Sequence, residues 1–156
     1  MKLVYITKRK AFTLIELVVV MVIVGVIAAV TLIKWPGSSL MLEQQADRLK
    51  HDIRYAQNLS MTQGERYAFI KTASNTYQIQ NTAGSVLIET ITLGSGITFS
   101  SLINLPNNLV AFDSKGTPYT DAGSPGTALA TTASIILTQN GQTQTITITP
   151  ETGYVS

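Results

Sequence analysis

The sequence predicts an α+β protein in which a long N-terminal helix, apolar in its first half and amphipathic in its second, packs on an antiparallel β-sheet domain. Three observations lead to this fold class. Residues 17–33 carry no charged side chain. From Leu42 to Ser60, apolar and small residues recur at helical spacing. The rest of the chain alternates short runs of β-branched and aromatic residues with turn sequences.

The composition of the 156 residues fits one globular domain after an N-terminal segment. Hydrophobic residues make up 45% and charged residues 13%, and much of the apolar excess lies in residues 12–33. Four of the 11 Lys and Arg precede residue 12, so seven remain beside 9 Asp and Glu. A chain starting near Phe12 is therefore mildly acidic, which argues against nucleic-acid binding. The absence of cysteine excludes disulfides, thiolate metal sites and cysteine nucleophiles.

The N-terminal apolar segment is long enough for a membrane anchor. Residues 17–33 as a helix span roughly 25 Å, and residues 12–33 span about 33 Å. The basic cluster Lys8-Arg9-Lys10 before the helix is expected to stay in the cytoplasm. Lys34 and Trp35 at the far end suit a membrane–water interface.

Glu16 is the one charged residue inside this apolar segment. A carboxylate in lipid is costly unless it is paired, so it calls for a partner. Because it lies near the start of the helix, its negative charge interacts favourably with the helix dipole. The alternative is that Glu16 only extends toward the lipid headgroups and pairs with nothing.

A second helix is predicted over residues 36–64, as a continuation of the first that bends at Pro36. Ser38 or Ser39 is expected to cap it, and it ends near Gln63-Gly64. The face expected to pack on a sheet consists of Leu42, Ala46, Leu49, Ile53, Ala56 and Ser60.

The β-rich part begins after Gly64. The predicted strands are residues 66–71, 76–80, 85–92, 97–99, 109–112, 134–139 and 144–149. Asn140-Gly141 between the last two suits a type I′ hairpin turn. Within residues 85–92, alternation places Val86, Ile88, Thr90 and Thr92 on one face. In the last strand, Thr143, Thr145, Thr147 and Thr149 are expected to face solvent, and residues 120–133 are predicted to be a mobile loop.

The segment Lys8-Arg9-Lys10-Ala11-Phe12-Thr13-Leu14-Ile15-Glu16-Leu17 resembles the processing site of type IV prepilins and of the pseudopilins of type II secretion. The resemblance implies cleavage between Ala11 and Phe12 and N-methylation of Phe12. Ala11 departs from the family, which usually has Gly before the cut, so slower cleavage is expected. The resemblance also implies that Glu16 meets the terminal amine of a neighbouring subunit during assembly.

The resemblance extends along nearly the whole chain, through Ala46-Asp47-Arg48-Leu49, Phe112 with Gly116, and Thr152-Gly153. This order is similar to the H-type minor pseudopilins of type II secretion and the FimT-type minor pilins. It implies four parts: a prepilin leader (1–11), a transmembrane and filament-core helix (12–35), an amphipathic stem helix (36–64) and a β-rich globular domain (65–156).

The function implied by this resemblance is that of a minor pilin or pseudopilin subunit in a type II secretion pseudopilus or a type IV pilus. The implied partners are prepilin peptidase, other pilin or pseudopilin subunits, the inner-membrane assembly platform and membrane lipid. The chain would cross the inner membrane once, with its C-terminal domain outside the cytoplasm, and would then enter a filament.

Two other functions stay open. The same family contains DNA-binding minor pilins of natural transformation, which carry arginines after the final Gly. The tail Gly153-Tyr154-Val155-Ser156 has none, and no Lys or Arg follows Lys115, so binding to phosphates is not expected. The second alternative is an exported soluble periplasmic protein cut by ordinary signal peptidase near Ala29, after Val26-Ile27-Ala28.

Nothing in the sequence indicates catalysis, a cofactor or a metal. His51 is the single histidine and lies on a charged part of the predicted helix, so a surface position is expected. The spacing of Asp113, Asp121 and Glu151 matches no cation loop, and Asp113 is better explained as a turn former.

Overall fold

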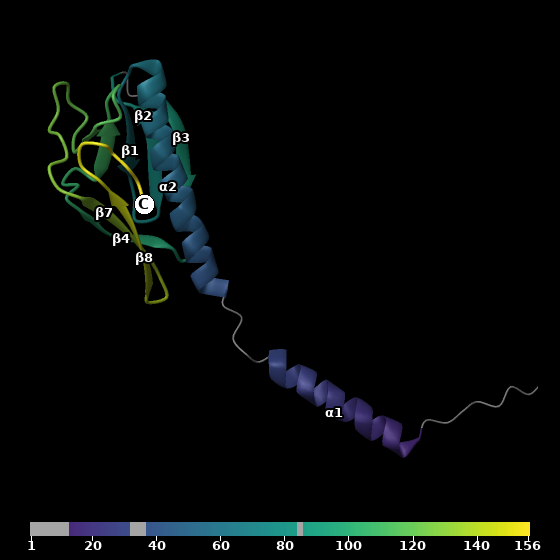
Figure 1. Cartoon of the computed structure of the whole chain (residues 1–156). Coiled ribbons are helices and arrows are strands. Elements are labelled where there is room, and N and C mark those ends of the chain that lie inside the picture. The colour runs from purple at the N-terminus through teal and green to yellow at the C-terminus, as the bar shows by residue number, and fades with distance from the viewer. Residues whose placement is uncertain (1–12, 32–36, 84–85) are drawn as a thin grey trace, which may run out of the picture. The chain divides into compact units, whose positions relative to one another are not determined.

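The computed structural model describes residues 13–31, 37–83 and 86–156. The chain divides into two compact units, Met1–Pro36 and Gly37–Ser156, and each is described here by itself (Figure 1). The first unit contains α1 (Leu14–Thr31), and the second contains α2 (Gly37–Gln63) together with all eight strands of the described residues. Pro36, where the sequence predicts a bend, lies outside the described residues.

The second predicted helix is confirmed in its end and in its buried face. It begins at Gly37, ahead of both serines proposed as caps, so the predicted cap at Ser38 or Ser39 is wrong: both already belong to the helix. It ends at Gln63, and Gly64 follows with a φ of 71°, the left-handed conformation in which glycine commonly terminates helices. Every member of the predicted packing face is buried: Leu42, Ala46, Leu49, Ile53, Ala56 and Ser60.

Two antiparallel sheets complete the second unit. The sequence predicts the antiparallel β-structure but not its division into two sheets. The five-stranded sheet has the order β3 (Val86–Thr92), β2 (Thr76–Asn81), β1 (Tyr67–Lys71), β5 (Leu109–Phe112) and β6 (Pro118–Tyr119). The three-stranded sheet has the order β4 (Thr98–Ile103), β7 (Ala133–Gln139) and β8 (Gln142–Ile148). β4 is longer than predicted because it continues until Asn104, whose φ of 61° breaks the extended conformation.

The hairpin between β7 and β8 forms as predicted. Asn140 and Gly141 both have positive φ, 51° and 79°, which a type I′ turn requires at its two central positions. The threonine face of β8 and the residue after it is exposed at Thr143, Thr145 and Thr149. Thr147 is partly covered, because its backbone N–H and C=O pair with Ser156 at 3.0 Å each.

The side-chain alternation predicted for β3 is wrong. In the pairing with β2, Ile79 lies opposite Glu89 and Gln80 opposite Leu87, so Ile88 is an extra residue that forms a β-bulge. Because of the extra residue, the side chain of Val86 lies on the other face of the strand from that of Thr90. The single face predicted for alternate residues of this strand therefore does not exist.

Residues 120–132 form a loop, as predicted, but this loop is anchored rather than loosely attached. Tyr119 forms a bridge with Ala128, and the N–H groups of Thr120 and Leu129 donate to Thr127 and Pro118 at 2.9 Å each. Leu129 is buried in the main core. The small residues that surround Leu129 in the sequence did not predict its burial in the core.

The core lies between α2 and the sheets. Three rings meet there: Phe69 and Tyr77 have centroids 5.3 Å apart, and Phe99 lies 6.1 Å from both. Ile53 and Leu49 from the helix and Ile135, Ile146 and Ile148 from the three-stranded sheet join them in one cluster of buried side chains. These three aromatic residues of the strands thus serve the core.

Candidate assembly site on the N-terminal helix

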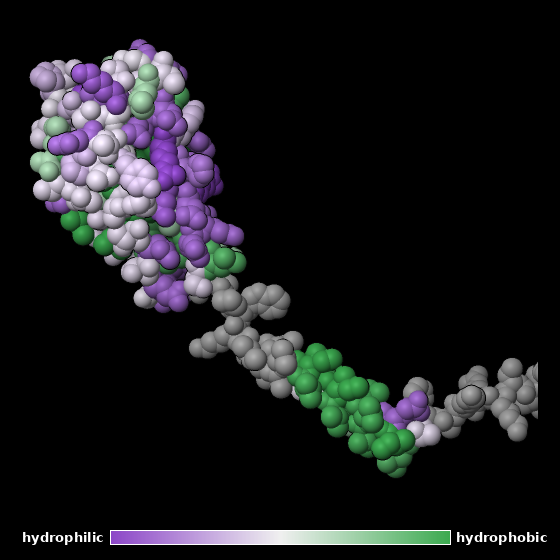
Figure 2. Space-filling view, viewed as in Figure 1, coloured by the Kyte–Doolittle hydropathy of each residue, from purple (hydrophilic) through white to green (hydrophobic). Residues whose placement is uncertain are grey.

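α1 exposes apolar side chains along its described length. From Leu17 to Ile27, its large hydrophobic residues are between 45% and 68% exposed. Figure 2 shows this helix as a continuous hydrophobic surface, whereas polar side chains run along α2. A helix that is apolar all round is stable only when lipid or other helices cover it. No helix within the described residues combines the length and apolarity that crossing a membrane requires.

The first turn of α1 holds the predicted assembly residue, Glu16, in a capping box. The Thr13 N–H and the Thr13 hydroxyl each donate to Glu16 Oε2 at 3.3 Å, and the Glu16 N–H donates to Thr13 Oγ1 at 3.3 Å. This reciprocal pattern satisfies N–H groups that a helix otherwise leaves without partners at its N-terminus. The carboxylate also lies where the helix dipole favours a negative charge.

The capping box holds the Glu16 carboxylate in place without using all of its hydrogen-bond acceptor sites. Both residues are exposed, so the carboxylate can accept a further donor while it caps the helix. Sequence reasoning missed Thr13, although Thr13-Leu14-Ile15-Glu16 is the sequence signature of a capping box. The two predicted processing residues, Ala11 and Phe12, lie outside the described residues.

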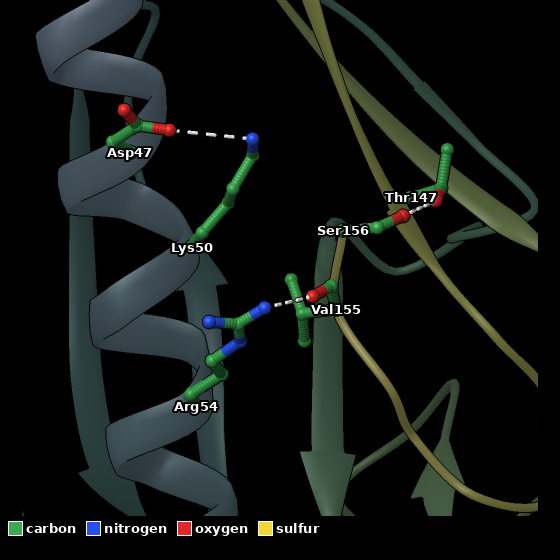
Figure 3. A network of polar contacts seen from close by, with 6 residues as sticks. All are labelled: Asp47, Lys50, Arg54, Thr147, Val155 and Ser156. Atoms are coloured by element: carbon green, nitrogen blue, oxygen red, sulfur yellow. Dashed lines mark hydrogen bonds and ion pairs between the residues drawn. The ribbon is translucent and has the colours of Figure 1, made fainter.

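A second feature missed from the sequence is the way the C-terminal tail is fastened to the domain. Val155 pairs with Ile148 of β8 and is fully buried. Arg54 of α2 donates to the Val155 carbonyl at 2.5 Å, and Thr147 and Ser156 share a hydroxyl hydrogen bond of 2.5 Å (Figure 3). Lys50 and Asp47 on the same helix pair with each other at 3.3 Å. The tail is therefore a structural strap across the domain.

A buried tyrosine ties the core to the surface of α2. The Tyr77 hydroxyl donates to Asp52 Oδ2 at 2.5 Å. Burial, followed by the hydrogen bond and the negative charge of Asp52, raises the pKa of Tyr77 well above its ordinary value of 10.0. Arg48 lies 3.8 Å from both Asp52 and Glu89, so this network connects α2 to β3.

The residues weighed for catalysis or cation binding do not come together. His51 is exposed. Asp113 accepts the N–H groups of Lys115 and Thr117 at 2.9 Å each, which makes it the turn former expected. Asp121 organises its own loop by accepting from Gly123 and Thr127. Among the described residues, no group of three or more His, Cys, Asp or Glu is placed to hold a metal.

One hollow on the second unit is lined by charged side chains that already have partners within the domain. It has a volume of about 340 Å³ and is lined by Gly64, Glu65, Arg66, Thr82, Ala83, Asp113, Ser114, Ala122 and Ser124. Arg66 donates to the Gly123 carbonyl and lies over the Tyr119 ring, while Glu65 accepts from Asn81. Arg66 and Glu65 in this hollow thus serve the fold.

Comparison with known proteins identifies the N-terminal segment and the fold. Residues 6–32 match the family described as the prokaryotic N-terminal methylation motif. No curated protein sequence matches the chain. Two crystal structures of the type IV minor pilin FimU of Pseudomonas aeruginosa PAO1 are similar, at TM-scores of 0.55 and identities of 16% and 17%. They align with 74% of this chain and with 86% and 90% of theirs.

The minor pseudopilin EpsH from the type 2 secretion system of Vibrio cholerae is also similar. Its TM-score is 0.54 at 12% identity, over 74% of this chain and 94% of that chain. At such identities the likeness concerns the fold. It confirms the predicted α+β, pilin-like architecture. Residues 6–32 match the methylation motif that the resemblance to prepilins implies. The chain joins a prokaryotic N-terminal methylation motif to a type IV pilin-like fold.

Proposed function

We propose that this protein is a minor pilin or pseudopilin, a structural subunit that assembles into a type IV pilus or a type II secretion pseudopilus. The observation that carries the proposal is α1, an apolar helix that lies within the matched methylation motif. Its side chains are exposed, and its first turn holds one carboxylate, Glu16. Apolar helices of neighbouring subunits would cover this surface in a filament. The role is structural and includes no catalytic step.

In this proposal the chain is processed and divided as its sequence suggests. Prepilin peptidase removes residues 1–11 by cutting between Ala11 and Phe12, and Phe12 is then N-methylated. Residues 12–35, which extend beyond α1 on both sides, cross the inner membrane once, and residues 36–64 and 65–156 lie outside the cytoplasm. The subunit leaves the membrane through an inner-membrane assembly platform.

Glu16 has two roles in this proposal. Within the subunit it caps α1 through Thr13, and in the filament it also accepts the terminal amine of a neighbouring subunit. The pairing neutralises two charges that are each costly in an apolar surrounding. Because the carboxylate has four lone-pair sites, the cap and the intersubunit bond can coexist.

The proposal is tested by isolating sheared surface filaments and the inner-membrane fraction from cells that express the full chain. The proposal expects the chain in a complex with other subunits that begin with the same motif. It expects Glu16→Ala to remain in the membrane but to leave that complex. A chain that is soluble in the periplasm, or a Glu16→Ala variant that assembles normally, contradicts the proposal.

A further inference from the structure

The tip of the β7–β8 hairpin consists of Asn140 and Gly141, the only Asn-Gly pair in the sequence. Both residues are exposed. An asparagine can react with its own backbone when the nitrogen of the next residue reaches the side-chain carbonyl carbon and closes a cyclic imide. Glycine at the next position favours this reaction, because it has no side chain to hinder the approach.

The two reacting groups at the tip are not held by hydrogen bonds. The hairpin ladder ends at the Gln139–Gln142 pair, so Asn140 and Gly141 lie beyond it. Within the described part of the chain, no hydrogen bond engages the Asn140 side-chain amide or the Gly141 backbone N–H. An added Cβ on Gly141 would meet no atom within 4 Å. The Asn140 amide is therefore free to turn toward the nitrogen of Gly141.

Two other exposed asparagines share the backbone conformation of Asn140 but not its surroundings. Asn104 and Asn108 have φ values of 61° and 56°, close to the 51° of Asn140. Each is followed by a leucine whose side chain is buried, and burial holds the backbone nitrogen that would have to attack. The Asn104 amide also donates to a backbone carbonyl at 2.8 Å. These two residues are therefore matched comparisons within the same molecule.

We propose that Asn140 is a site of spontaneous deamidation in which Gly141 supplies the nucleophile. The backbone nitrogen of Gly141 loses its proton to base in the solvent and attacks Cγ of Asn140, which forms a new N–C bond. The bond between Cγ and the side-chain nitrogen breaks, and this nitrogen takes up a proton and leaves as ammonia. Water then adds to one of the two carbonyls of the cyclic imide and breaks its bond to nitrogen.

The two imide carbonyls lead to different products. Opening at Cγ leaves an ordinary aspartate at position 140, and aspartate before glycine also suits a type I′ turn. Opening at the main-chain carbonyl gives isoaspartate, whose backbone path runs through Cγ and no longer matches the geometry of the turn. The adjacent Gln139 is buried and donates to the Ser95 carbonyl at 3.1 Å. Isoaspartate would therefore loosen the contact between the hairpin and the segment that joins β3 to β4.

Either product places a negative charge where the sheet has none. Residues 122–150, which include β7 and β8, contain no charged residue, and neither does β4. Modified chains would therefore carry a new local field at the hairpin tip and would be more acidic than newly made chains. This modification does not depend on the assembly of the chain into a filament.

The test is incubation of the purified full chain in detergent, at neutral and at mildly alkaline pH. Digestion in acid and mass spectrometry of the peptides then locate the product. We expect a mass gain of about 1 Da at Asn140, with isoaspartate among the products. Conversion there should be about tenfold faster than at Asn104 or Asn108, and Gly141→Ala should slow it about tenfold. The rate should rise with pH, because the attacking nitrogen must first lose its proton.

The same incubation in urea shows how fast the unfolded chain reacts at this position. An Asn140 that stays intact in the folded chain overturns the proposal, since the hairpin would then protect the amide. Conversion at the same rate at Asn104 or Asn108 also overturns it. So does aspartate formed without isoaspartate, because direct hydrolysis of the amide would then be the route in place of attack by Gly141.

Discussion

Thr13 and Glu16 cap each other at the start of α1: the backbone N–H and hydroxyl of Thr13 reach Glu16 Oε2, and the Glu16 N–H reaches Thr13 Oγ1, all at 3.3 Å. The residue to which we assign intersubunit pairing is therefore already positioned within its own subunit. A carboxylate fixed by its own helix loses less side-chain entropy when it binds a neighbour.

Mutations at Thr13 and Glu16 can separate the helix cap from the pairing between subunits. Thr13→Ala removes the cap and should destabilise the first turn of α1 by about 1 kcal/mol, while the carboxylate for the neighbour remains. Glu16→Ala removes both. We expect filament incorporation of Thr13→Ala to fall at most a few-fold and that of Glu16→Ala to be lost. Quantitative immunoblots of the membrane complex and of sheared filaments measure both. Equal loss in the two variants would mean that Glu16 acts through the cap alone.

Ala11 leads to a prediction about processing. Prepilin peptidases usually meet glycine before the cut, and alanine adds a methyl group at that position. We expect Ala11→Gly to raise the rate at which the leader is removed several-fold in a pulse–chase experiment. Ala11→Val, with a larger side chain at the same position, is the opposing control and should leave the chain uncut. An unchanged rate for Ala11→Gly contradicts the assigned cleavage site.

Gly153 should be essential for the C-terminal strap. Its φ is 63°, and an added Cβ would lie 2.6 Å from the Gly116 carbonyl oxygen and 2.9 Å from Phe112 Cε1. Gly141 is the matched control, since it has a φ of 79° and no atom within 4 Å of an added Cβ. In residues 37–156 we expect Gly141→Ala to cost about 1 kcal/mol from backbone strain alone, and Gly153→Ala roughly 3 kcal/mol because a steric clash is added. Urea unfolding midpoints compare the two, and equal costs would exclude the clash.

Asp121 makes the loop at residues 120–127 sensitive to acid. Hydrogen bonds from Thr127 and Gly123 lower the pKa of Asp121 below its ordinary value of 3.8. A lowered pKa means that the carboxylate stabilises the loop above pH 3.8 and that this contribution disappears as the pH falls through the lower value. The amide NMR signals of Gly123 and Thr127 should therefore move only below pH 3.8. Asp121→Asn is the control that should abolish the transition, and a transition above pH 3.8 would contradict this account.

Periodicity in the sequence was enough to predict the parts of the fold that local patterns determine. The buried face of α2 follows from the recurrence of Leu42, Ala46, Leu49, Ile53 and Ala56, and the β7–β8 turn follows from Asn140-Gly141, because each depends on residues near one another in the chain.

The features that the sequence did not predict depend on distant or irregular contacts. The bulge at Ile88 shifts a register that strict alternation cannot anticipate. The strap joins Arg54 to Val155, 101 residues later, through a backbone carbonyl that has no side-chain signature. Thr13 is the exception: its capping box is a local pattern, and it could have been found from the sequence.

The central claim is that this chain is processed as a pilin-like subunit, and its mature N-terminus tests that most directly. The measurement is the intact mass and N-terminal sequence of the protein extracted from membranes. We predict a chain that begins at Phe12 with one added methyl group on its amine. A chain that begins near Ala29, or one that still carries Met1, would contradict the account, because the apolar segment would then be a signal peptide or a simple anchor.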